Sequence, residues 1–121
     1  MRVGHTATTG EVVCRVDRGG SALGNPFVVR AEGERDAACD AYGALLEKTL
    51  AGETRIDALA LGRAHGFGGE VRWWDAPAAR DAFAGLVAER GAGRKVCLAC
   101  HCRPLRCHAE EIACALVRSR E

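Results

Sequence analysis

A long helical stripe in the first half of the chain is the feature that most constrains its fold. From Glu34 onward, apolar and small residues recur every three or four positions, the spacing that places side chains on one face of an α-helix. Gly52 follows at the position of a C-terminal helix cap. The pattern predicts a helix over residues 34–50 with a buried face made of Ala37, Ala38, Ala41, Tyr42, Leu45, Leu46 and Leu50.

Short β-like segments surround this stripe. They are apolar and β-branched, and they are bounded by turn-forming residues, so they predict strands. These predicted strands cover residues 11–16, 27–30 and 94–100. The stretch 65–74 is broken by glycines before it becomes β-like, which indicates an edge strand.

Three further helices are predicted after the stripe. Thr54 and Asp57 have the spacing of a capping box, and Asp75 is a favourable N-cap with Pro77 in the first turn. These helices cover residues 55–63, 75–91 and 109–119. Strands and helices therefore alternate along the chain. The alternation predicts an α/β fold, a small Rossmann-like layered domain in which helices flank a partly parallel sheet.

The composition limits the classes of function. A chain of 121 residues suits one domain with its own core, so we treat residues 1–121 as a single α/β domain. The net charge of +1 gives no strong nucleic-acid signal, and no segment predicts a membrane span. The N-terminus has no signal-peptide pattern, and seven cysteines are an odd number. We therefore expect a cytoplasmic protein with free or metal-bound thiols. The oligomeric state is unknown from the sequence.

Residues 97–108, CLACHCRPLRCH, form a Cys/His cluster with four cysteines and two histidines. Strand alternation places Cys100 and Cys102 on one face at the C-terminal end of the predicted strand. Cys107 and His108 then fall at the start of the last predicted helix. Ligands of open α/β sheets bind at this end of the strands, often against helix N-termini. The functional site is therefore expected at this crossover.

Two kinds of chemistry suit the Cys/His cluster, and a crowded loop without a chemical role is the third interpretation. Zn²⁺ prefers thiolate and imidazole ligands, and its candidate ligands are Cys100, Cys102, Cys107 and His108, not all four at once. Without a metal, Cys102 or Cys107 is a candidate catalytic nucleophile with His108 as its base. Arg103 and Arg106 would lower the pKa of a nearby thiol and bind an anionic ligand. All three interpretations stay open.

Two other segments are candidates for ligand contact. The glycine-rich stretch 19–27, GGSALGNPF, allows a ligand to approach the backbone, although a glycine-rich Asn-Pro sequence alone indicates a turn. Trp73 and Trp74 could stack on a base. Adjacent tryptophans on a strand are nevertheless typical of one core ring and one surface ring.

Three stretches together resemble an uncharacterised bacterial and phage family that is known only as a domain of unknown function. They are GNPF at 24–27, ERDAACDAYGALL at 34–46 and LACHCRPLRCHAEEI at 98–112. Members of this family typically carry a Trp-Gly-Asn-Pro-Phe stretch, where this chain has Leu23, and a C-terminal Cys-x-Cys-x-Pro-x-x-Cys-His motif. The resemblance implies a compact Rossmann-like domain. It also implies that the site near the cysteines includes Gly24, Asn25, Pro26 and Arg35.

The sequence thus leads to a specific expectation. The protein would be a small cytosolic α/β protein that binds an anionic, nucleotide-like molecule at the Cys/His cluster, with thiolate- or zinc-assisted catalysis. A zinc-stabilised, non-enzymatic binding module and a thiol redox sensor are the alternatives. The sequence indicates neither the reaction nor the substrate.

Overall fold

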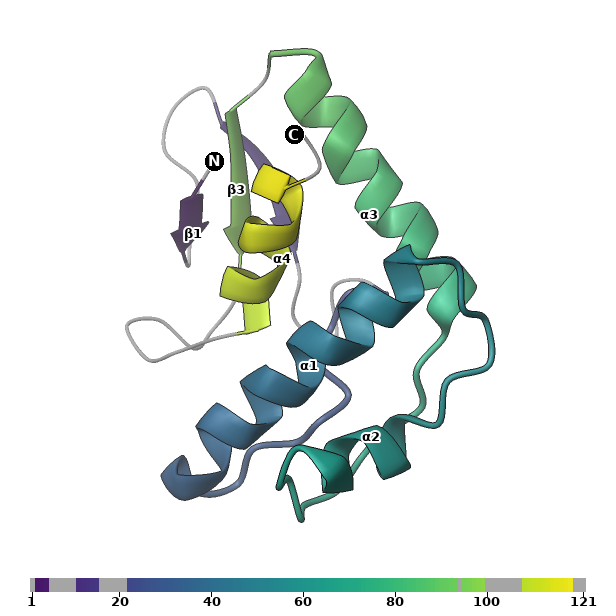
Figure 1. The fold of residues 1–121 in the computed structure, drawn as a ribbon. Coiled ribbons are helices and arrows are strands. Elements are labelled where there is room, and N and C mark those ends of the chain that lie inside the picture. The colour runs from purple at the N-terminus through teal and green to yellow at the C-terminus, as the bar shows by residue number, and fades with distance from the viewer. Residues whose placement is uncertain (1, 5–10, 16–21, 94, 100–107, 119–121) are drawn as a thin grey trace.

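The computed structural model describes residues 2–4, 11–15, 22–93, 95–99 and 108–118 (Figure 1). Side chains are described for 22–93, Leu98 and 108–118. The elements within these residues are β1 (Arg2–Gly4), β2 (Glu11–Arg15), a 3₁₀ turn (Glu32–Glu34), α1 (Arg35–Leu50), α2 (Ala58–Ala64), α3 (Ala76–Gly91), β3 (Lys95–Ala99) and α4 (His108–Arg118).

The predicted helices are confirmed because their signals are local. α1 ends in a Schellman motif, in which the backbone N–H of Glu53 donates to Lys48 at 3.2 Å and that of Gly52 to Thr49 at 3.1 Å. Gly52 has a φ of 100°, which a residue without a Cβ adopts at low cost. α3 starts after Asp75, whose Oδ1 accepts a hydrogen bond of 3.0 Å from Ala78 N–H.

The expected capping box before α2 is wrong. Asp57 itself is the N-cap, and its Oδ1 accepts a hydrogen bond of 3.0 Å from the backbone N–H of Ala60. Thr54 therefore lies before the helix rather than at its cap. A side-chain oxygen does cap the start of this helix, as the pattern predicts, but it belongs to Asp57 and not to Thr54.

The strands form a three-stranded parallel sheet in the order β1-β3-β2. In its register, Leu98 pairs with Val3 on one side and with Cys14 on the other. The predicted strand at 27–30 is wrong. That segment makes one isolated antiparallel bridge, from Phe27 to Val71. The edge strand expected in 65–74 is wrong as well, because Val71 takes part in this bridge and no strand forms there.

α1 packs against the other three helices, and α4 lies between α1 and the sheet. Figure 1 shows α3 along one side of this assembly, where it also contacts β3. The core runs through these layers and is formed by buried residues that include Tyr42, Leu45, Leu46, Phe83, Leu86, Leu98, Ile112 and Leu116. The start of α4 is thereby held against the middle of α1.

The expectation of a Rossmann-like α/β domain is wrong. Among the residues whose side chains are described, 63% are helical and 4% lie in strands, so the domain is mostly helical. β1 and β2 are only six residues apart in the sequence, fewer than the dozen or more of a βαβ crossover, and β3 lies between them in the sheet. Three helices instead follow one another between β2 and β3 and pack together around α1.

Candidate functional site

Tyr42 joins three segments that are far apart in the sequence. It lies on the buried face of α1 with no exposed surface. Its hydroxyl donates a hydrogen bond of 2.6 Å to the carbonyl oxygen of Leu23. Its ring packs edge to face against His108 and Trp74, at centroid separations of 4.9 and 5.8 Å. One side chain therefore connects the turn at 23–27, the start of α4 and the segment before α3.

His108 is the cysteine or histidine of the Cys/His cluster whose side chain is described, whereas Cys97 is placed by its backbone in β3. It is the first residue of α4, it is 5% exposed, and its ring lies against Tyr42. The sequence placed it at an open site, whereas the structure places it in the packed interior. The other predicted members of that site lie outside the described residues, and their roles stay predictions: Cys100, Cys102, Arg103, Arg106 and Cys107.

The prediction of a metal-binding group is corrected for the described part of the chain. No group of three or more His, Cys, Asp or Glu side chains there could hold a metal ion. The imidazole of His108, an expected ligand, is packed against an aromatic ring. Cys39 is a buried free thiol and Cys114 an exposed one. The other predicted zinc ligands, Cys100, Cys102 and Cys107, lie outside the described residues, so zinc binding there stays a prediction.

The turn at 23–27 is held in one conformation from two sides. The Asn25 Oδ1 accepts a hydrogen bond of 2.9 Å from the backbone N–H of Phe27, which closes an Asx turn. The carbonyl oxygen of Pro26 accepts one of 2.8 Å from the backbone N–H of Arg72. Phe27 is buried in the core. The backbone at Gly24, Asn25 and Pro26 is thus fixed before any ligand arrives.

A cavity of about 200 Å³ lies beside this turn. It is lined by Ala22, Gly24, Asn25, Pro26, Arg72, Trp73, Trp74 and Asp75. Trp73 is 89% exposed, whereas Trp74 is 7% exposed and donates from Nε1 to the Thr49 hydroxyl at 3.1 Å. The tryptophan pair therefore divides into one core ring and one surface ring, as the sequence predicted, and both rings line the cavity.

The amide of Asn25 has a defined orientation in this cavity. A backbone N–H can only donate, so the atom 2.9 Å from the nitrogen of Phe27 must be the amide oxygen. The Nδ2 amino group is then the donor of this side chain, and it donates to no acceptor within the described part of the chain. Asp75 uses one oxygen to cap α3. The lining thus offers an amide donor and a carboxylate.

Glu70 forms ion pairs with two arginines, and Glu32 forms one. Hydrogen bonds from Arg72 at 3.0 Å and Arg30 at 2.6 Å lower the pKa of Glu70. A hydrogen bond from Arg35 lowers the pKa of Glu32, with Nη2 of Arg35 2.7 Å from its carboxylate. Arg35, which the resemblance assigned to the site, therefore has at least one carboxylate partner of its own.

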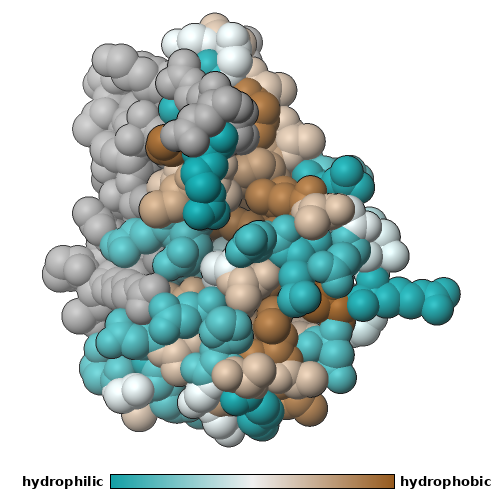
Figure 2. All heavy atoms as spheres, in the orientation of Figure 1, coloured by the Kyte–Doolittle hydropathy of each residue, from teal (hydrophilic) through white to brown (hydrophobic). Residues whose placement is uncertain are grey.

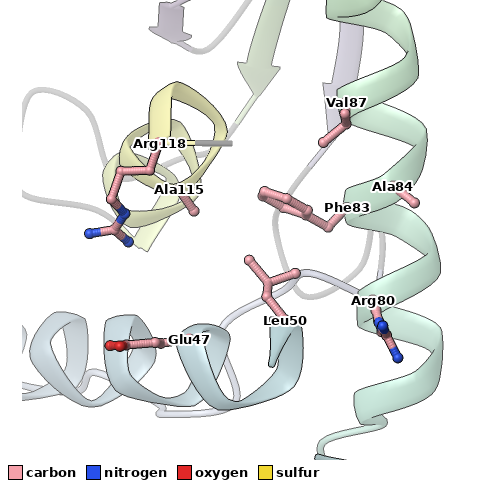
Figure 3. Close-up of a pocket in the computed structure, with 8 residues that line it drawn as sticks. All are labelled: Glu47, Leu50, Arg80, Phe83, Ala84, Val87, Ala115 and Arg118. Carbon is pink, nitrogen blue, oxygen red and sulfur yellow. The ribbon is translucent and has the colours of Figure 1, made fainter. Parts of the chain in front are cut away.

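A larger cavity of about 620 Å³ lies between α1, α3 and α4. Figure 3 shows Leu50, Phe83, Val87 and Ala115 directed into the space between the helices. In Figure 2, hydrophobic surface is visible where these helices come together. Its remaining lining is Glu47, Arg80, Ala84 and Arg118. This groove is apolar, and nothing in the described residues indicates a reaction there.

Sequence reasoning missed three members of the site. Arg72 and Asp75 flank the tryptophans in the run RWWD, and Asp75 was read as a helix cap alone. Tyr42 was assigned to the buried stripe of α1. That assignment is right, but the stripe carries no signal for its partners at Leu23 and His108. The signal for this part of the site was the presence of Arg72 and Asp75 on either side of two adjacent tryptophans.

None of the helices in the described ranges is both long and apolar enough to cross a membrane. The fold and the cavity together define a small, mostly helical domain with a cavity beside the turn at 23–27. Residues 2–118 match the family described as Domain of unknown function (DUF4326), and the chain belongs to this family. The resemblance is confirmed at that level. Comparisons with curated proteins and with solved structures gave no match.

Proposed function

We propose that this domain binds an anionic, nucleotide-like small molecule between the turn at 24–26 and the start of α4. The observation that carries the proposal is the connection through Tyr42, which contacts both Leu23 and His108. Two segments separated by most of the chain, each singled out by the sequence, thereby lie one side chain apart. The small cavity beside the turn supports the proposal because it is lined by polar groups.

The negative charge of the ligand requires positive partners beyond a helix end. α4 has 11 residues, and its N-terminus carries a partial positive charge. Glu110 and Glu111 already lie in its first turn and offset that charge. We therefore assign the anion to Arg103 and Arg106, which precede α4 in the sequence, together with the helix end.

The thiols of the Cys/His cluster belong to the same proposal. Cys102 and Cys107 would supply a thiolate near the ligand, and the buried His108 would act by fixing the start of α4. A cytoplasmic setting is part of the proposal because it keeps thiols reduced. The free thiols of Cys39 and Cys114 support it. We also infer that the GNPF and Cys-x-Cys-x-Pro-x-x-Cys-His motifs mark this site across a bacterial and phage family.

A ligand panel tests the proposal directly. Thermal unfolding would be followed with nucleoside mono-, di- and triphosphates and with inorganic phosphate and pyrophosphate. A binding ligand raises the melting temperature by several degrees at about 100 times its Kd. The double variant Arg103→Gln/Arg106→Gln should lose most of that rise. If no member of the panel stabilises the protein, the proposed function is wrong.

A matched pair of variants separates binding from general destabilisation. Tyr42→Phe removes the hydrogen bond to Leu23, and Asp57→Ala removes the cap of α2, which does not line the cavity. Both changes destabilise the fold. Tyr42→Phe should weaken ligand binding as well, whereas Asp57→Ala should leave the Kd unchanged. Equal Kd values for both variants would show that Tyr42 has no part in the site.

A further inference from the structure

Trp73 is an unusual surface residue. At 89% it is far more exposed than Leu59 and Val117, each at 50%, among the large apolar side chains that the structure describes. We infer that Trp73 is a stacking platform for a planar nitrogen heterocycle, whose edge is read by Asn25 and Asp75. This inference rests on the proposed function, and it names the ring class that the ligand carries.

The backbone on both sides of Trp73 is held in place. Before it, the N–H of Arg72 donates to the carbonyl oxygen of Pro26 at 2.8 Å. After it, the indole of Trp74 is buried and donates to Thr49 at 3.1 Å. The exposed indole is thus presented from a fixed segment. A tryptophan side chain has only two rotatable bonds, so it loses little conformational freedom when a ring stacks on it.

The polar groups beside Trp73 suit the edge of a nitrogen heterocycle. The Nδ2 amino group of Asn25 can donate to a ring nitrogen or carbonyl. The second oxygen of Asp75 is not used in capping α3, and it can accept from a ring N–H or amino group. A donor and a carboxylate acceptor lining one cavity match a purine-type edge, which offers an acceptor next to an N–H group.

The size of the cavity agrees with this assignment. About 200 Å³ is less than the 300–1,000 Å³ of pockets that enclose a whole drug-sized ligand. It accommodates one ring system, so the sugar and phosphate would extend out of the cavity.

The test compares ligands with and without the ring on defined variants. Isothermal titration calorimetry would measure AMP, GMP, adenosine, guanosine and ribose 5-phosphate against the full chain. The variants are Trp73→Ala, Trp73→Phe and Asp75→Asn, with Leu59→Ala as a control for loss of an exposed apolar side chain. We expect AMP or GMP to bind at least about fivefold more tightly than ribose 5-phosphate, because base stacking on an aromatic side chain is worth at least that factor.

Trp73→Ala should remove this advantage, and Trp73→Phe should retain most of it, whereas Leu59→Ala should leave it unchanged. Asp75→Asn keeps a capping side chain and should weaken binding through the lost acceptor.

If ribose 5-phosphate binds as tightly as the nucleotides, and Trp73→Ala changes nothing, the platform is overturned while the proposed function stands. If only the nucleosides bind, and Trp73→Ala abolishes their binding, the stacking platform stands and the proposal of an anionic ligand is wrong. If no compound binds, both are overturned.

Discussion

The hydroxyl of Tyr42 and the carbonyl oxygen of Leu23 form a 2.6 Å hydrogen bond across 19 positions of the sequence. Both side chains are at most 1% exposed, so the bond forms away from water. Removing a buried hydrogen bond of this kind costs about 0.5–1.5 kcal/mol. Tyr42→Phe should therefore lower the free energy of unfolding in urea by that amount. An unchanged midpoint would mean that another donor replaces the hydroxyl.

Two helical glycines should respond to alanine in opposite directions. A Cβ at Gly62 would lie 2.8 Å from Cε1 of Phe27, whereas a Cβ at Gly85 meets nothing within 4 Å. Phe27 is buried and packs edge to face against Phe67 at 5.5 Å, so its ring has little room to move. Gly62→Ala should destabilise the fold by about 1–3 kcal/mol through overpacking. Gly85→Ala should stabilise it by about 0.5–1 kcal/mol through helix propensity. Thermal unfolding of the two variants would be compared with the wild type, and a shift of the same sign for both would contradict this account.

The hydroxyl of Thr49 holds Trp74 in the wall of the cavity. It accepts from Trp74 Nε1 at 3.1 Å and donates to the carbonyl of Leu45 at 2.8 Å. Thr49→Val keeps the shape but leaves a buried indole N–H unpaired, at a cost of about 1–3 kcal/mol. Thr49→Ser keeps the hydroxyl and should cost less. Denaturant unfolding followed by tryptophan fluorescence distinguishes them, and equal stability of both variants would rule out this role.

The pKa of Glu70 should be measurable by NMR titration as a value below the ordinary 4.5, because Arg72 and Arg30 donate hydrogen bonds to its carboxylate. A carboxyl group with a lowered pKa in the folded state stabilises the fold above the pKa of the unfolded chain. That contribution is lost as the pH falls through the lower, folded-state pKa. The pair is exposed, so its effect on stability is small. Arg72→Gln should raise the pKa of Glu70 toward its ordinary value, while Arg55→Gln should not, and equal effects would indicate a general charge effect.

The helices were predictable because their signals lie within each segment. The stripe of α1, the Asp75 cap and the charge order of α4 required no knowledge of distant residues. The sheet was harder because strand order depends on pairing across the whole chain. The three apolar residues at 27–29 match both a strand and a buried extended segment, and only the single bridge to Val71 shows which of the two forms. The alternation of strand and helix signals along the sequence therefore led to the wrong prediction of a Rossmann-like fold.

The candidate site was predictable only where its signals lie within one segment of the sequence. The two ends of the candidate site, the GNPF turn and the start of α4, were found from residue types. Their connection was not, because Tyr42 follows the same periodicity as its apolar neighbours on α1. Its partner His108 follows in another helix, late in the chain. Alternation correctly divided Trp73 from Trp74, but it gave no information about the cavity between them and the turn.

The sheet order has a consequence for synthesis on the ribosome. β3 is the central strand, and it is made after β1, β2 and the first three helices. Neither N-terminal strand has a partner in this sheet until residues 95–99 have left the exit tunnel. The first two strands therefore wait with unpaired backbone groups while the helices assemble, and pairing closes the longest loop of the fold last.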